Sequence, residues 1–217
     1  MESILELQQV SKTFPKSNFT LDNVSFSLPY GAIMGFVGEN GAGKTTTIGC
    51  ILNTLRRDGG TVKLFGQEMQ DVDTDLREKI GVVYDGDNFP GFWNARQLSR
   101  VMSGLYRQWD NALFQKYLED FRLPVKQKIK SYSRGMTMKL AIAAALSHHP
   151  QLLILDEATS GLDPVVRDEM LDIFLTFIQQ ENHSIFLSSH ITSDLEKVAD
   201  YITFIHNGRL ITTVSKN

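Results

Sequence analysis

Residues 38–45 read Gly38-Glu39-Asn40-Gly41-Ala42-Gly43-Lys44-Thr45 and match the pattern G-x-x-x-x-G-K-[ST] at every fixed position. The apolar run 32–37 precedes them and is typical of a strand buried on both faces. We expect a helix over 44–55. In a loop between a strand and a helix, glycines let backbone N–H groups turn inward and cradle phosphate, and the helix N-terminus adds partial positive charge.

A chance glycine turn is the competing interpretation of this loop. The complete match in a strand–loop–helix context favours a site for a nucleoside triphosphate. Lys44 is then expected to reach the β- and γ-phosphates, and the Thr45 hydroxyl to bind Mg²⁺. The motif alone does not say what the energy of the triphosphate is used for.

Strand patterns recur on both sides of the loop. Before it, alternating apolar and polar residues predict antiparallel strands, whereas the runs after it are short and continuously apolar. Asn207-Gly208 is a strong hairpin signal between the last two strands. The predicted strands are 3–10, 19–28, 32–37, 61–65, 80–84, 152–155, 185–187, 201–206 and 209–214.

Helical patterns separate these strands and fill 94–148 completely. Asn94 and Asp110 are suited to N-caps, Asp163-Pro164 to the start of a helix, and Ser193-Asp194-Leu195-Glu196 to a capping box. The order of elements predicts an α/β fold. We expect a P-loop NTPase core with a mainly parallel sheet, an N-terminal antiparallel β sub-domain and an α-helical sub-domain inserted at about 88–148.

Size and charge narrow the class of protein. A chain of 217 residues predicts a single domain over 1–217. Twenty-two basic and 25 acidic residues leave a net charge of −3, without the basic excess of a nucleic-acid binder. Cys50 is the single cysteine, so we expect a reducing cytoplasm. No apolar run approaches the roughly 20 residues that span a bilayer, and the start shows no signal peptide.

Two neighbouring acids follow the apolar run 152–155. Asp156 is expected at the tip of that strand, where a carboxylate can hold Mg²⁺ directly or through water. Glu157 points the other way and is a natural general base for an attacking water. A solvated acidic turn is the competing interpretation, which the phosphate loop upstream disfavours.

Three further segments separate this chain from other phosphate-loop proteins. They are Ser131-Tyr132-Ser133-Arg134-Gly135-Met136, Ser160-Gly161-Leu162-Asp163 and Ser188-Ser189-His190. With the phosphate loop and the acidic strand end, this ordered set resembles the ATP-binding subunit of ATP-binding-cassette (ABC) transporters, of the bacterial exporter type. The resemblance covers about residues 3–214.

The resemblance implies roles for residues that spacing alone does not assign. ATP would contact the whole phosphate loop, 38–45, together with Thr46. Asp156 and Thr45 would hold Mg²⁺, while Lys44, Glu157 and His190 would be catalytic, His190 touching the γ-phosphate. Two subunits would face each other head to tail, so that Ser133, Arg134, Gly135, Met136 and Asp163 contact the ATP held by the other subunit.

Three positions need separate comment. Phe14 occupies the place of the aromatic that stacks on adenine, with Phe19 as its rival. Asp85 stands where the family normally has a metal-binding glutamine, so it either holds Mg²⁺ or is an acidic loop residue. Arg134 replaces the glycine of the commonest pattern, Leu-Ser-Gly-Gly-Gln. It either adds charge at the phosphate or faces solvent, and we favour solvent.

The resemblance implies an ATPase at the cytoplasmic face of the cell membrane that powers a transporter, exporting peptides, drugs or lipids. Its partners would be membrane-spanning subunits and a second ATP-binding subunit, identical or different, and no nucleic acid. The stretch 86–107 is the expected docking surface, with Phe92 or Trp93 exposed. The alternatives are a non-transport ATPase of the same superfamily that acts on ribosomes or DNA, and a P-loop kinase of a small metabolite.

Overall fold

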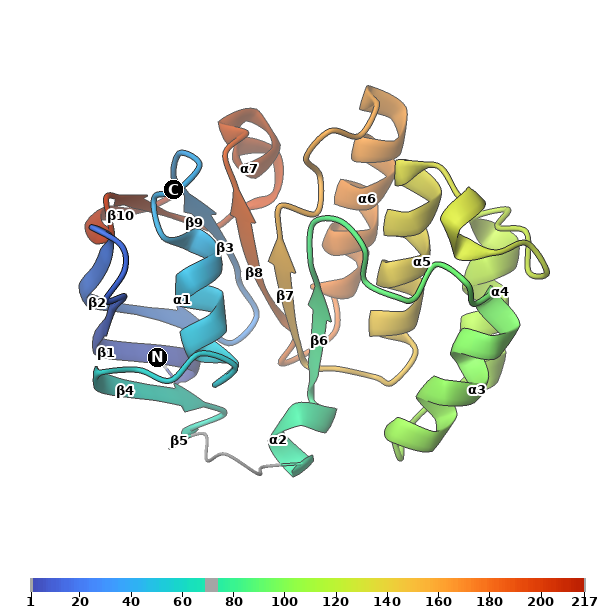
Figure 1. Ribbon diagram of the computed structural model, residues 1–217, viewed down its shortest axis with the longest axis horizontal. Helices are drawn as coiled ribbons and strands as arrows, with labels where there is room; N and C mark the ends of the chain where they lie inside the picture. The colour runs from blue at the N-terminus through green and yellow to red at the C-terminus, as the bar shows by residue number, and fades with distance from the viewer. Residues whose placement is uncertain (1, 69–73, 217) are drawn as a thin grey trace.

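In the computed structural model, residues 2–68 and 74–216 are described, and they form two sheets with helices around them (Figure 1). The larger sheet has the order β10-β9-β3-β8-β7-β6, parallel except for the terminal pair β9 and β10. Its strands are β3 (Ile33–Val37), β6 (Ile80–Val83), β7 (Leu152–Asp156), β8 (Ser184–Ser189), β9 (Tyr201–His206) and β10 (Arg209–Ser215).

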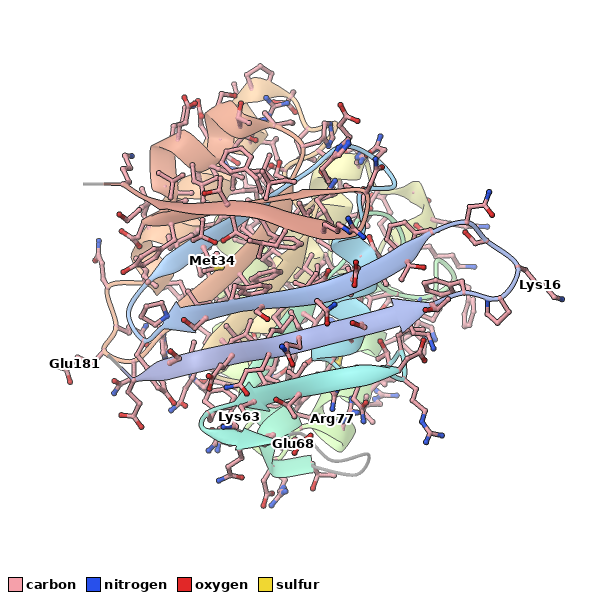
Figure 2. All side chains as sticks on the ribbon, turned by 90° about the vertical axis from the view of Figure 1, so that its left-hand side faces the viewer. Lys16, Met34, Lys63, Glu68, Arg77 and Glu181 are labelled. Carbon is pink, nitrogen blue, oxygen red and sulfur yellow. The ribbon has the colours of Figure 1, made fainter. Side chains whose placement is uncertain are left out.

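The smaller sheet is antiparallel throughout, in the order β2-β1-β4-β5. Its strands are β1 (Ser3–Thr13), β2 (Thr20–Pro29), β4 (Gly59–Leu64) and β5 (Gln67–Glu68). Along β2, buried and exposed residues alternate, because only one face meets the core. Figure 2 views this sheet face-on, with Lys16 at the tip of the β1–β2 connection and Lys63 on β4.

Helices cover the faces of the larger sheet. The helices are α1 (Lys44–Ile51), α2 (Thr74–Glu78), α3 (Ala95–Leu105), α4 (Asn111–Asp120), α5 (Arg134–Leu146), α6 (Pro164–Phe177) and α7 (Thr192–Val198), with a 3₁₀ turn at Ile129–Ser131. Figure 1 places α1 between the two sheets, and α3 and α4 at the end of the molecule away from β1 and β2. Strands β3, β7 and β8 are buried along their whole length, as their continuous apolar runs predict.

The helices α3, α4 and α5 share a core of their own. Phe114 and Leu118 of α4 pack with Leu98 of α3 and Leu140 of α5. Asn94 and Gln97 form a capping box at the start of α3, and the Asp110 side chain accepts a hydrogen bond from the Leu113 backbone N–H at the start of α4. The separate core makes this helical segment a distinct packing unit beside the sheet.

Some predicted boundaries were wrong. The helix after the phosphate loop ends at Ile51 and not at 55, because Asn53 takes a left-handed conformation (φ 54°) that breaks it. The predicted capping box at 193–196 is absent: α7 starts at Thr192, which places Ser193 inside the helix. Asp194 is instead buried 3.7 Å from the Arg167 guanidinium. Helix α2 was not predicted.

Among the described residues, we find no helix with both the length and the apolar character needed to cross a bilayer.

A buried histidine, His148, makes the stability of the fold depend on pH. His148 is almost fully buried, with its Nε2 3.0 Å from the Ile80 carbonyl oxygen and its ring stacked on Tyr106 at 4.0 Å between centroids. Burial lowers the pKa of His148 below its ordinary value of 6.5, and burial also lowers that of His183. The unfolded chain therefore binds more protons just below pH 6.5, and acidification through that window destabilises the fold.

At pH values below about 6.5, we expect the free energy of unfolding to decrease as the pH falls. The decrease is at most about 1.4 kcal/mol per pH unit for each of these two histidines. His148→Gln removes one of the two groups, so its urea-unfolding free energy should fall less steeply with acidification than that of the wild type. Equal slopes for the two proteins would show that His148 does not carry this pH dependence.

Candidate functional site

A cavity of about 580 Å³ opens where several loops leave the carboxyl edge of the larger sheet. Because β3, β6 and β7 run parallel, the loops that follow them meet at the same edge. The cavity is lined by Phe19, Asn40, Gly41, Gly43, Lys44, Thr45, Thr46, Tyr84, Asp85, Asp156 and Glu157. Residues from four separate stretches of the chain therefore converge on one site.

The phosphate loop wraps the amino end of α1. Gly41 and Gly43 have φ of 82° and 113°, which disfavours any residue with a side chain. A Cβ at Gly38 would lie 2.6 Å from the Ile205 carbonyl oxygen, so this position also needs glycine. The Lys44 ammonium is buried and donates hydrogen bonds to the carbonyl oxygens of Gly38 (2.6 Å) and Glu39 (3.1 Å).

Asp156 is fixed between two hydroxyl groups. Thr45 Oγ1 donates to Asp156 Oδ2 at 2.8 Å, and Ser188 Oγ donates to Oδ1. Ser188 faces Asp156 in the register of the parallel pair β7 and β8. No sequence motif assigned Ser188 to the site. Parallel pairing of the two apolar runs that form β7 and β8 is the feature that places it beside Asp156. Asp156 is thus oriented before any ligand arrives.

Glu157 links the loop lysine to the histidine after β8. Its Oε1 lies 3.1 Å from Lys44 Nζ, and its Oε2 lies 2.7 Å from His190 Nδ1. The backbone of Glu157 takes a left-handed conformation (φ 53°), an uncommon choice for a side chain of this size and typical of functional sites. The structure therefore brings together the three residues predicted to be catalytic.

The two candidate aromatic residues lie side by side. Their ring centroids are 6.2 Å apart, and Lys12 Nζ is 5.9 Å from the centre of the Phe14 ring. Phe19 lines the cavity and packs against the phosphate loop, where a Cβ at Gly43 would come within 2.9 Å of its ring. Phe14 is half-buried beside it.

The segment 133–136 and Asp163 do not join this cavity among the described residues that line it. The Ser133 hydroxyl caps α5 by accepting from the Met136 N–H, and Asp163 caps α6 by accepting from the Val166 N–H. The two helix starts are neighbours, since a Cβ at Gly135 would lie 3.3 Å from Val166. Within one subunit, Ser133, Gly135, Met136 and Asp163 therefore lie outside the cavity.

From the sequence we favoured an Arg134 side chain that faces solvent. The side chain is half exposed, but it also pairs with Asp85. Its guanidinium donates to Asp85 Oδ1 at 2.6 Å, with each side chain about half exposed. Asp85 lines the cavity, so the pair joins the start of α5 to the site. Isolated motifs gave no sign of this contact, because 49 positions separate the partners.

Comparison with known proteins gives consistent results. Residues 21–160 match a family model described as "ABC transporter". The chain is 33% identical to the bacitracin transport ATP-binding protein BcrA of Bacillus licheniformis. That alignment covers 97% of this chain and 69% of BcrA. The chain is also 33% identical to the lantibiotic transport ATP-binding protein SrtF of Streptococcus pyogenes, in an alignment that covers 96% of this chain and 89% of SrtF. A solved ATP-binding subunit of an ABC transporter superposes with a TM-score of 0.87, covering 98% of this chain and 90% of that one at 26% identity.

The phosphate loop, the Asp156–Glu157 strand end and the parallel sheet define an ATP-binding, ATP-hydrolysing P-loop domain. Within that class, the chain belongs to the ABC transporter family, as the ATP-binding subunit. The fold class inferred from the sequence is confirmed by the same comparisons.

Lys44 is the main buried cation of the cavity, so Lys44→Ala should weaken ATP binding. A charged hydrogen bond is worth about 1.5–3 kcal/mol, which predicts a loss of at least about tenfold in affinity. Equilibrium dialysis with ATP measures this loss. Lys63→Ala, which removes a lysine from β4 in the smaller sheet (Figure 2), is the control and should bind as the wild type does. ATP binding by Lys44→Ala as strong as that of the wild type would show that the phosphate loop does not form the ATP site.

Phe14 and Phe19 can be separated by their contacts. If Phe14 stacks on adenine, Phe14→Ala should weaken the binding free energy of ATP by about 1–3 kcal/mol, which is roughly 5- to 150-fold in affinity. Phe14→Trp keeps an aromatic ring and should bind ATP as the wild type does. Phe19→Ala should mainly lower the melting temperature, because Phe19 packs on the core. Normal ATP binding by Phe14→Ala, with a loss in folded Phe19→Ala, would transfer the role to Phe19.

Proposed function

We propose that this chain hydrolyses ATP to drive a membrane exporter of peptides. The chain is the ATP-binding subunit of an ABC transporter, and two of the relatives it resembles are named for the transport of bacitracin and of lantibiotics. The observation that carries the catalytic part is the position of Glu157 between Lys44 and His190.

The hydrogen bonds of Lys44 suggest how ATP prepares the site. The Lys44 ammonium donates to two loop carbonyls and lies within ion-pair distance of Glu157. An arriving phosphate competes with Glu157 for Lys44, because both are anions attracted to the same ammonium group. The displaced carboxylate keeps its bond to His190 and becomes available to orient and deprotonate water.

The oxygen atoms beside the phosphate loop fit a magnesium ion. Thr45 Oγ1 and Asp156 are in direct contact, and Asp85 lines the same cavity. Hard oxygen ligands of this kind are the ones Mg²⁺ prefers. When bound with ATP, the ion would offset phosphate charge during in-line attack. Lys44 and His190 would hold the γ-phosphate, and Glu157 would receive the proton of the attacking water.

A second ATP-binding subunit, identical or different, completes the site in this proposal. Ser133 and Gly135 lie at the amino end of α5, where a hydroxyl and backbone N–H groups are placed to grip an anion. They lie outside the cavity of their own chain, so they are free to close over the ATP of a partner. Arg134, Met136 and Asp163 would share that interface.

We place the protein at the cytoplasmic face of the membrane, bound to spanning subunits. The side chain of Phe92 is 68% exposed just before α3, as is that of Leu105 at its end. Exposed large apolar residues of this kind suit a docking surface. Trp93, the other candidate, is half-buried against the helical core and contributes less.

Glu157→Gln tests the proposal. Removing the base should lower ATP turnover by at least about 100-fold while ATP remains bound, so that sedimentation velocity shows a dimer in ATP. The control is Glu181→Gln, which neutralises an exposed glutamate (Figure 2) and should hydrolyse ATP normally. Wild-type turnover by Glu157→Gln would exclude Glu157 as the base, and a monomer in ATP would contradict the paired arrangement.

A further inference from the structure

Arg134 contacts two loops at the edge of the cavity. Its guanidinium bonds Asp85, in the loop after β6. It also lies over Gly161, in the loop between Glu157 and α6, where an added Cβ would meet its Cζ at 2.8 Å. Gly161 has φ of 66° as well, so this loop is shaped to accept the guanidinium.

The acids of the cavity differ in how their charge is offset. Asp156 accepts from the hydroxyls of Thr45 and Ser188, and Glu157 is paired with Lys44. Asp85 is paired with Arg134 across the rim. Since ATP is itself strongly negative, an unpaired carboxylate at Asp85 would oppose its entry.

Asp85 and Arg134 face each other at the rim of the cavity. Here the two positions carry opposite charges, and their side chains touch at 2.6 Å. Either charge alone would change the electrostatic potential of the cavity rim, whereas the pair leaves its net charge as two neutral residues would.

We propose that Arg134 is a positioning residue that neutralises and holds Asp85, so that the carboxylate of Asp85 does not oppose the entry of a triphosphate into the cavity. The inference rests on the proposed function in taking ATP as the ligand. It differs from a direct role of Arg134 on the phosphate of a partner subunit, because it acts within one chain and on the first binding of nucleotide.

The test is a double-mutant cycle on ATP affinity, measured by equilibrium dialysis in EDTA so that no metal contributes. Asp85→Asn and Arg134→Gln are compared with the double variant, which has the net charge of the wild type. Arg134→Gln should weaken binding about fivefold or more at low ionic strength, and much less at high ionic strength, because salt screens the exposed Asp85 charge. The double variant should return to within about twofold of the wild type.

Arg100→Gln is the matched control, since it removes an exposed arginine of α3 and changes the net charge equally. It should bind ATP as the wild type does. Binding by the double variant as weak as that of Arg134→Gln would overturn the proposal, because the loss would then not depend on Asp85. Wild-type affinity in Arg134→Gln at low salt would also overturn it. ATP binding by the wild type in the same series tests the proposed function separately.

Discussion

The parallel pairing of β3, β8 and β7 is the constraint on which the site depends. These three strands are buried along their whole length, so a change of register would misplace close-packed core side chains. The observed register sets Val37 beside Ser189 and Asp156 beside Ser188. The phosphate loop, the two acids and His190 are the residues that directly follow or end these strands, so packing of the core sets their spacing.

That constraint also explains the polar chemistry at the edge. Buried ionisable groups are tolerated only where each finds a partner. Here the buried Lys44 pairs with Glu157, which also contacts the exposed His190, and the buried Asp156 is held by hydroxyls. The helical segment has its own core and places Ser133 away from this edge. One subunit thus holds a cradle for nucleotide, and the start of α5, which we propose contacts the ATP of a partner, lies elsewhere.

Local patterns were enough to predict every described strand except β5, the hairpin, most helix caps and the convergence of the phosphate loop with Asp156–Glu157. Continuous apolar runs and complete motifs are properties of neighbouring residues, which a sequence displays directly. The contacts that were missed join distant positions. Ser188 reaches Asp156 only through strand register, and Arg134 reaches Asp85 across 49 positions. The capping box at 193–196 failed because burial of Asp194 outweighed a local capping preference.

We propose that each ATP is enclosed by the cradle of one subunit and the α5 start of another. A mixing experiment tests it most directly. Lys44→Ala damages the cradle, whereas Ser133→Asp keeps an N-cap on α5 but turns a negative charge toward phosphate. Each variant alone should release no phosphate from ATP. An equimolar mixture should regain activity, because mixed pairs contain one undamaged site. A mixture as inactive as its components would contradict the account.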